Sequence, residues 1–183
     1  MDLEIGSGKG TFLVQQASLE PQVRFLGVEY ARAFALYAGD RLRRRGVANA
    51  RMMHTDGVML IRFYLPNDFF RQVHLYFPDP WPKKRHHKRR FFQTENLIEV
   101  HRVLMDPTPG LPESGRFRVA TDHADYFAWM EEHAKQAEHL FERLPYEPPA
   151  SAGECEVVGT NFERKYREEG RTFHGMILRK RPA

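Results

Sequence analysis

The sequence predicts an α/β protein built on an open, mostly parallel sheet. Short apolar segments typical of buried strands alternate along the chain with segments in which apolar residues recur at helical spacing. Several predicted strands are followed at once by glycine or by an acidic residue, as at Gly6 and Glu29. Because ligands bind at the carboxyl ends of parallel strands, these residues predict a binding site at that edge of the sheet.

The composition is that of one globular domain with an anionic partner. The chain has 183 residues, of which 42% are hydrophobic and 28% charged, enough to bury a single core. Its formal net charge of +4 favours an anionic partner such as nucleic acid. Cys155 is the single cysteine, which excludes an internal disulfide and fits a reducing compartment. Because the chain shows no signal peptide and no apolar run near the roughly 18 residues of a membrane span, we expect a cytoplasmic protein.

The first predicted strand, residues 3–5, runs directly into the glycine-rich segment Gly6-Ser7-Gly8-Lys9-Gly10. An apolar helix is expected to follow, from about residue 11 to residue 17. A glycine turn between a strand and a helix brings backbone amides close to a ligand. Gly6 and Gly8 are therefore candidate cofactor-binding residues.

Three cofactor classes compete for this loop. A phosphate-binding loop for ATP requires a glycine where Leu3 stands, so we exclude ATP. A dinucleotide fingerprint requires its third glycine one residue after Gly10, which weakens the case for NAD. The G-x-G-x-G form after the acidic Glu4 is similar to the first motif of S-adenosylmethionine methyltransferases, a short pattern that also recurs by chance.

Two further acidic residues follow the next two predicted strands. Glu29 ends the strand at residues 23–28, and an acid there can accept both ribose hydroxyls of NAD or of S-adenosylmethionine. The alternative for Glu29 is an exposed acid favoured by a helix dipole. Asp56 follows the strand at residues 50–54 and could bind an adenine amine, cap the helix expected at residues 58–64, or do both. Together with the glycines, these acids favour an adenosyl cofactor.

A helix is predicted at residues 32–45, closed by Gly46 as its C-cap. Its larger apolar residues are Phe34, Leu36, Tyr37 and Leu42. Four arginines near its end are expected to be surface charges that compensate the helix dipole rather than RNA ligands. These are Arg41, Arg43, Arg44 and Arg45.

The most informative segment runs from Phe77 to Arg90. The strand predicted at residues 73–77 leads into Pro-Asp-Pro-Trp-Pro, whose prolines stiffen the backbone around Asp79, while Trp81 offers a flat face to a nucleobase. Six of the eight residues from Lys83 to Arg90 are Lys or Arg, enough to neutralise several phosphates. A rigid acid joined to a basic run predicts chemistry on a base within a nucleic acid.

A plainer interpretation exists for both features. Basic runs are usually solvated surfaces, and Pro-Asp-Pro can be an ordinary turn. The position of Asp79 directly after a strand, at the edge where ligands bind, favours the functional interpretation. The candidate RNA-contacting residues are Arg85, Lys88, Arg89 and Arg90.

The C-terminal half continues the alternation, with a helix at residues 91–104, a strand at 116–120 and a helix at 124–140. Asp122 either caps the last of these helices or is a second acid that binds the target base. Thr160-Asn161-Phe162-Glu163 matches a capping box at the head of a short helix. A terminal antiparallel pair is expected between residues 141–146 and residues 172–179.

Taken together, the motifs resemble those of the bacterial tRNA (guanine-N7)-methyltransferases. The run Phe-Pro-Asp-Pro-Trp-Pro-Lys-Lys-Arg-His from Phe77 is the most specific part of the match, which extends over nearly the whole chain. The other matching segments are Leu3 to Gly10, Gly27 to Glu29, Asp56, Thr121-Asp122 and Thr160 to Lys165.

The resemblance implies a Rossmann-like class I methyltransferase fold, with a seven-stranded, mostly parallel sheet, an antiparallel C-terminal strand and helices on both faces. It implies S-adenosylmethionine as methyl donor, S-adenosylhomocysteine as product, no metal, and a guanosine in the tRNA variable loop as acceptor. No obligate protein partner is evident. By motif match, Asp79 would be the catalytic acid and Glu4, Glu29 and Asp56 would contact the cofactor. The substrate would be contacted by Lys83, Asp122, Thr160, Asn161, Phe162 and Glu163.

Members of this family usually carry an N-terminal extension ahead of the glycine loop. We expect a single methyltransferase domain over residues 1–183 that lacks this extension. One alternative is a catalytically weak or inactive RNA-binding module that retains the fold. Methylation of an exocyclic base amine is disfavoured because Trp81 follows a single proline, Pro80, and a dehydrogenase is disfavoured by the glycine spacing.

Overall fold

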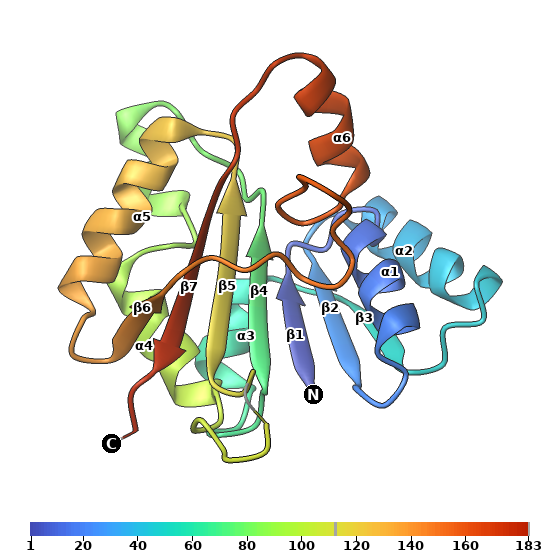
Figure 1. The fold of residues 1–183 in the computed structure, drawn as a ribbon, viewed down its shortest axis with the longest axis horizontal. Coiled ribbons are helices and arrows are strands. Elements are labelled where there is room, and N and C mark those ends of the chain that lie inside the picture. The colour runs from blue at the N-terminus through green and yellow to red at the C-terminus, as the bar shows by residue number, and fades with distance from the viewer. Residues whose placement is uncertain (112, 183) are drawn as a thin grey trace.

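Figure 1 shows the computed structural model, which describes residues 1–111 and 113–182. Its centre is a seven-stranded sheet in the order β3-β2-β1-β4-β5-β7-β6. The strands are β1 (Asp2–Ile5), β2 (Phe25–Glu29), β3 (Ala50–His54), β4 (Gln72–Tyr76), β5 (Arg116–Thr121), β6 (Phe141–Leu144) and β7 (His174–Lys180). The helices are α1 (Thr11–Leu19), α2 (Arg32–Arg44), α3 (Gly57–Phe63), the 3-10 helix η1 (Lys84–Arg89), α4 (Thr94–Val103), α5 (Ala124–Gln136) and α6 (Asn161–Glu168).

The strand directions confirm the predicted fold class. Strands β1 to β5 run parallel, whereas β7 runs antiparallel to both β5 and β6. Because β1 pairs with both β2 and β4, the strand order reverses between β1 and β4. The loops after these two strands therefore border the crevice in which open α/β sheets bind ligands, at the upper edge of the sheet in Figure 1.

Alternate residues of the central strands face different surroundings. Leu3, Val73 and Phe117 belong to the main apolar cluster, which also contains residues of α3, α4 and α5. On the opposite face, His74 packs against Phe12 of α1, and Arg118 donates to the backbone of the segment that follows β6. This segment crosses β5 and β4 in Figure 1 before it reaches α6. One face of the sheet is thus apolar, and the other carries buried polar groups.

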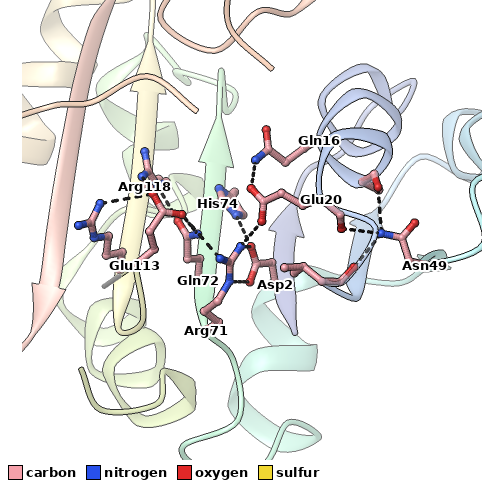
Figure 2. Close-up of polar contacts among 12 residues, drawn as sticks. Asp2, Gln16, Glu20, Asn49, Arg71, Gln72, His74, Glu113 and Arg118 are labelled. Carbon is pink, nitrogen blue, oxygen red and sulfur yellow. Dashed lines mark hydrogen bonds and ion pairs between the residues drawn. The ribbon is translucent and has the colours of Figure 1, made fainter. Parts of the chain in front are cut away.

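The buried polar groups satisfy one another in a network toward the amino ends of the strands (Figure 2). Arg71 Nη2 donates to Asp2 at 2.6 Å and to Glu20 at 2.7 Å. His74 Nε2 lies 3.5 Å from an oxygen of Asp2, and His74 Nδ1 lies 3.0 Å from the hydroxyl of Tyr76. A buried polar group without a hydrogen-bond partner lowers the stability of the folded state. On this face the network supplies those partners, and it takes the place that apolar packing has on the other face.

Two helices have an end that differs from the sequence prediction by three or four residues. The helix expected from residue 91 begins at Thr94, because Phe91 and Phe92 are buried and their carbonyls are held by side chains. Asn96 donates to Phe91 O, and Trp129 Nε1 donates to Phe92 O, both at 2.7 Å. The helix expected to reach residue 140 ends at residue 136. Within the described part of the chain, no helix has the length and hydrophobicity that a bilayer crossing requires.

Candidate active site

The glycine loop connects the carboxyl end of β1 to α1. Gly6, Gly8 and Gly10 have positive φ values of 77°, 53° and 68°, a region that favours glycine. A Cβ on Gly10 would also lie 2.8 Å from the Cβ of Ala38, so α2 packs directly against the loop. The positive φ values favour glycine at all three positions of the turn, and Gly10 also permits the close approach of α2.

A cavity of about 740 Å³ opens beside this loop. Its floor contains Glu4, Gly6, Ser7 and Gly8, together with Tyr76 and Phe77 from the end of β4. Its walls come from α2 and α6, and its remaining lining residues are Lys9, Thr11, Phe12, Phe34, Tyr37, Arg41, Arg44, Arg45, Thr160, Asn161, Phe162, Lys165 and Tyr166. The predicted residues Glu4, Gly6, Gly8, Thr160, Asn161 and Phe162 thus line one cavity.

Glu4 is a buried carboxylate at the base of this cavity. It is 5% exposed, and its Oε2 atom has no hydrogen-bond partner among residues 1–111 and 113–182. The pKa of Glu4 is raised to about 7, chiefly by burial; a hydrogen bond from Ser7 opposes this rise, and the nearby charge of Glu29 adds to it. An unpartnered buried carboxylate facing a cavity is suited to bind a cation such as an ammonium group.

Glu29 and Asp56 stand at the ends of β2 and β3, where the sequence predicted them. The carboxylate of Glu29 accepts the amide of Gly8 at 2.8 Å and the amide of Ala31 at 2.7 Å. Asp56 Oδ1 accepts the amides of Val58 and Met59 at 2.8 and 3.1 Å, so the N-cap role is confirmed. Neither acid is among the residues that line the cavity.

Asp79 lies on an exposed loop after β4. The loop is bent at both ends, with positive φ values of 51° at Phe77 and 42° at Trp81. The guanidinium carbon of Arg89 lies 4.8 Å from the ring centre of Trp81, so a cation already occupies one face of the ring that was predicted to stack on a nucleobase. Asp79 does not line the cavity, and the predicted carboxylates therefore do not converge on a single closed pocket.

The basic run forms η1 and the turns that flank it. Lys83, Arg85, Lys88 and Arg89 are exposed, as phosphate-binding residues must be. Arg90 is only 2% exposed, its Nε donates to Pro80 O at 2.8 Å, and its guanidinium lies over the rings of Tyr126 and Trp129. The prediction that Arg90 contacts RNA is therefore wrong, because this side chain anchors the Asp79 loop to α5 from within.

The motif from Thr160 to Glu163 begins α6. The Thr160 hydroxyl accepts the amide of Glu163 at 3.1 Å, which confirms the predicted N-cap. Glu163 is fully buried and accepts the amides of Val158 and Gly159 at 2.8 and 2.9 Å, instead of reaching back to the amide of Thr160. A full capping box would also have the Glu163 side chain accept the amide of Thr160. Here that bond is replaced by the two hydrogen bonds from Val158 and Gly159, which hold α6 against the preceding segment.

Asp122 does not cap α5. The N-cap is His123, whose Nδ1 accepts the amide of Tyr126, while Asp122 pairs with Arg171 at 2.5 Å. Arg171 also lies 3.8 Å from the ring centre of Tyr166, so this pair connects the end of β5 to α6. In the described ranges, no group of three or more side chains is placed to hold a metal ion.

Comparison with known proteins identifies the family. A family model described as a putative methyltransferase matches residues 1–176. The tRNA (guanine-N(7)-)-methyltransferase of Halorhodospira halophila is 36% identical over 98% of this chain and 74% of its own length. The protein of the same name from Jannaschia sp. is 39% identical over 98% of this chain and 72% of its own length. The chain belongs to the tRNA (guanine-N(7)-)-methyltransferase family.

The fold of this chain is similar to that of a solved methyltransferase structure. The S-adenosylmethionine-dependent O-methyltransferase of Thermotoga maritima superposes with a TM-score of 0.59 at 16% identity, covering 100% of this chain and 60% of its own. At that identity the likeness concerns the fold alone. The class I methyltransferase architecture, predicted from the resemblance, is therefore confirmed.

Several cavity residues of this methyltransferase were not singled out by the sequence. Tyr76 is an ordinary member of an apolar strand until the end of β4 is placed beside the glycine loop. Tyr166 follows Phe162 by one helical turn, and this spacing was an available signal. The residues of α2 carried no such signal, because only tertiary packing turns them toward α6.

Proposed function

We propose that this protein transfers a methyl group from S-adenosylmethionine to N7 of a guanosine in the variable loop of tRNA. The relationship to proteins named tRNA (guanine-N(7)-)-methyltransferases over nearly the whole chain carries this proposal. A glycine loop, a buried carboxylate and an exposed basic run at one edge of the sheet support it. Such an enzyme would work in the cytoplasm, where its tRNA substrate is found.

Glu4, Glu29 and Asp56 would hold the cofactor. The ammonium group of its amino-acid end would supply the partner that Glu4 Oε2 lacks. Ribose hydroxyls at Glu29 would take the place of the Gly8 and Ala31 amides as hydrogen-bond donors. Both cap bonds of Asp56 go to Oδ1, which leaves Oδ2 for an adenine amine.

The chemistry requires alignment more than proton transfer. Guanine N7 has an in-plane lone pair and no proton, so no general base is needed to create the nucleophile. The bound cofactor supplies an electrophilic methyl group on a sulfonium sulfur. The surrounding residues would therefore act by holding N7, the methyl carbon and the sulfur in line and by excluding water.

Asp79 is proposed to bind the target guanine. Its carboxylate would accept hydrogen bonds from N1–H and the exocyclic amine, select guanine, and stabilise the positive charge that the purine acquires. Exposure of Asp79 suits this role, because the base arrives from solvent on a large RNA. The nearby Lys83, Arg85, Lys88 and Arg89 would bind phosphates. Asp122, Thr160, Asn161 and Phe162 would border the base from the side of α6. Glu163 is buried and would position these residues through its bonds to the preceding segment instead of contacting the base itself.

The direct test is incubation of the purified protein with labelled methyl donor and unmodified tRNA, followed by nucleoside analysis. We expect 7-methylguanosine as the labelled nucleoside. A matched tRNA in which 7-deazaguanosine replaces the target guanosine lacks the nucleophilic nitrogen and should stay unlabelled. Label in any other nucleoside would reassign the reaction, and absence of label would support the inactive RNA-binding alternative.

A further inference from the structure

Helix α2 carries two stripes of side chains. Its buried stripe is made of small or aliphatic residues, Ala35, Ala38 and Leu42. A second stripe lines the cavity at helical spacing and consists of Phe34, Tyr37, Arg41 and Arg44, followed by the C-cap residue Arg45. Phe34 and Tyr37 are 44% and 47% exposed, although they are the larger apolar residues of the helix. The aromatic rings of α2 are thus turned toward the cavity and away from the core.

The opposite wall of the cavity is also aromatic. The ring centre of Phe162 lies 5.0 Å from that of Phe77 and 4.6 Å from that of Tyr166. These three rings form a row from the end of β4, where the Asp79 loop begins, along α6. Rings on both walls offer apolar surfaces that start next to the proposed catalytic loop.

The same cavity is strongly basic. Its cationic lining residues are Lys9, Arg41, Arg44, Arg45 and Lys165, against the single acid Glu4 at its base. Arg44 is partly neutralised by Asp40 at 2.7 Å. Arg45 makes no ion pair with any other described residue, so its charge is available to a ligand. The wall of α2 therefore favours an anion beside the rings.

A cleft lined by both aromatic rings and cationic side chains is suited to bind single-stranded nucleic acid. Single-stranded nucleic acid is bound by aromatic faces that stack with bases and by basic side chains that hold phosphates. We propose that the walls of this cleft, formed by α2 and α6 above the floor at which Glu4 would hold the cofactor, bind unpaired nucleotides of the tRNA next to the target guanosine. The inference rests on the proposed function and revises the expectation that the arginines of α2 only compensate the helix dipole.

The position of the cleft supports this assignment. In Figure 1, α2 and α6 lie on one side of the carboxyl edge of the sheet and α5 on the other. The basic helix η1 lies beside α5, since the ring centre of His87 is 5.3 Å from that of Trp129. An RNA that presents a base at the edge would thus meet basic surfaces on both sides of it.

The test compares two arginines of one helix region. Arg45→Gln removes a charge from the cleft, whereas Arg43→Gln removes the same charge from a side chain that is 75% exposed and does not line the cavity. Binding of unmodified tRNA is measured by fluorescence anisotropy at several salt concentrations. We expect Arg45→Gln to weaken binding several-fold and to reduce the slope of log K against log salt by about 0.7, the value for one single-strand phosphate contact. Arg43→Gln should match the unaltered protein.

Tyr37→Ala tests the aromatic part without a change of charge. Loss of one stacked base should weaken tRNA binding by at least about fivefold and leave the salt slope unchanged. Calorimetric titration of S-adenosylmethionine checks that the cofactor site of each variant is intact. If Arg45→Gln and Tyr37→Ala bind tRNA as Arg43→Gln does, or if the unaltered protein binds no tRNA, the inference is overturned. Weakened binding in a protein that transfers no methyl group would support the cleft and contradict the proposed function.

Discussion

Glu4 and Asp2 lie two residues apart on β1, yet their pKa values move in opposite directions. Burial raises the pKa of Glu4 to about 7, and no cation offsets it. Burial would also raise the pKa of Asp2, but hydrogen bonds from His74 and Arg71 outweigh this effect and lower it. At a pH above its ordinary pKa, Asp2 therefore stabilises the folded state, and this contribution is lost in acid. Glu4 has the opposite effect, because it lowers the free energy of unfolding as the pH rises above its ordinary pKa.

This difference predicts how stability depends on pH. Between the ordinary pKa of 4.5 and the folded value of about 7, the folded protein holds a proton on Glu4 that the unfolded chain has lost. Raising the pH through this window therefore favours unfolding, by up to about 3 kcal/mol at 1.36 kcal/mol per pKa unit. We expect Glu4→Gln to lose this decline in the free energy of unfolding, measured by urea denaturation at pH 5 and pH 8. An identical decline in the variant would show that Glu4 is not the group responsible.

Asp79 is the residue on which the proposed chemistry depends most. Asp79→Ala should lower the rate of methyl transfer by at least about 100-fold, because the variant cannot stabilise the positive charge on the purine. Affinity for S-adenosylmethionine should not change, since Asp79 lies outside the cavity that contains Glu4. The matched control is Asp125→Ala, which removes an exposed carboxylate from the first turn of α5. Equal activity of Asp79→Ala and Asp125→Ala would remove Asp79 from the mechanism.

At the scale of an element, η1 divides the basic run into two kinds of residue. Arg85, Lys88 and Arg89 are exposed, whereas Arg90 is enclosed by aromatic rings. Charge alone does not distinguish them in the sequence. The distinction arises because the chain leaves η1 at Arg90 in an extended conformation, beside α5.

This division predicts different outcomes for neighbouring arginines. Neutralising Arg85, Lys88 and Arg89 together should raise the KM for tRNA and reduce the salt slope of binding by about two units, at roughly 0.7 to 0.9 per phosphate. Arg90→Gln should instead lower the free energy of unfolding, because it removes a buried hydrogen bond and two cation–π contacts. Tryptophan fluorescence during urea denaturation measures the second effect. If the triple variant had an unchanged salt slope, these three side chains would be solvated charges that do not bind phosphates.

At the scale of the whole molecule, Arg71 joins parts that are distant in the sequence. Its guanidinium contacts Asp2 on β1, Glu20 after α1 and Glu113 before β5 (Figure 2). The contacts hold the polar face of the sheet together near its amino edge, opposite the proposed active site. This network therefore lies at the edge of the sheet away from the proposed active site.

Removal of Arg71 should destabilise the protein without a direct effect on the site. Arg71→Met removes the guanidinium that donates to both oxygens of the buried Asp2 carboxylate, at a cost of about 3–5 kcal/mol. Arg24→Met, at an exposed position at the same edge, is the control and should cost little. Thermal and urea unfolding measure both variants. If their free energies of unfolding were equal, the network would not be a major source of stability.

The sequence by itself determined the order of strands and helices, the glycine loop, the acids at three strand ends and the membership of a methyltransferase family. These features are local, because they depend on apolar periodicity, on positive φ values that favour glycine and on short motifs. Tertiary structure alone decided which charges are buried and which side chains meet. Examples are the burial of Arg90, the ion pair between Asp122 and Arg171, and the aromatic rings of α2 that line one cavity with α6. Burial and pairing depend on neighbours contributed by distant segments, and no local pattern specifies those neighbours.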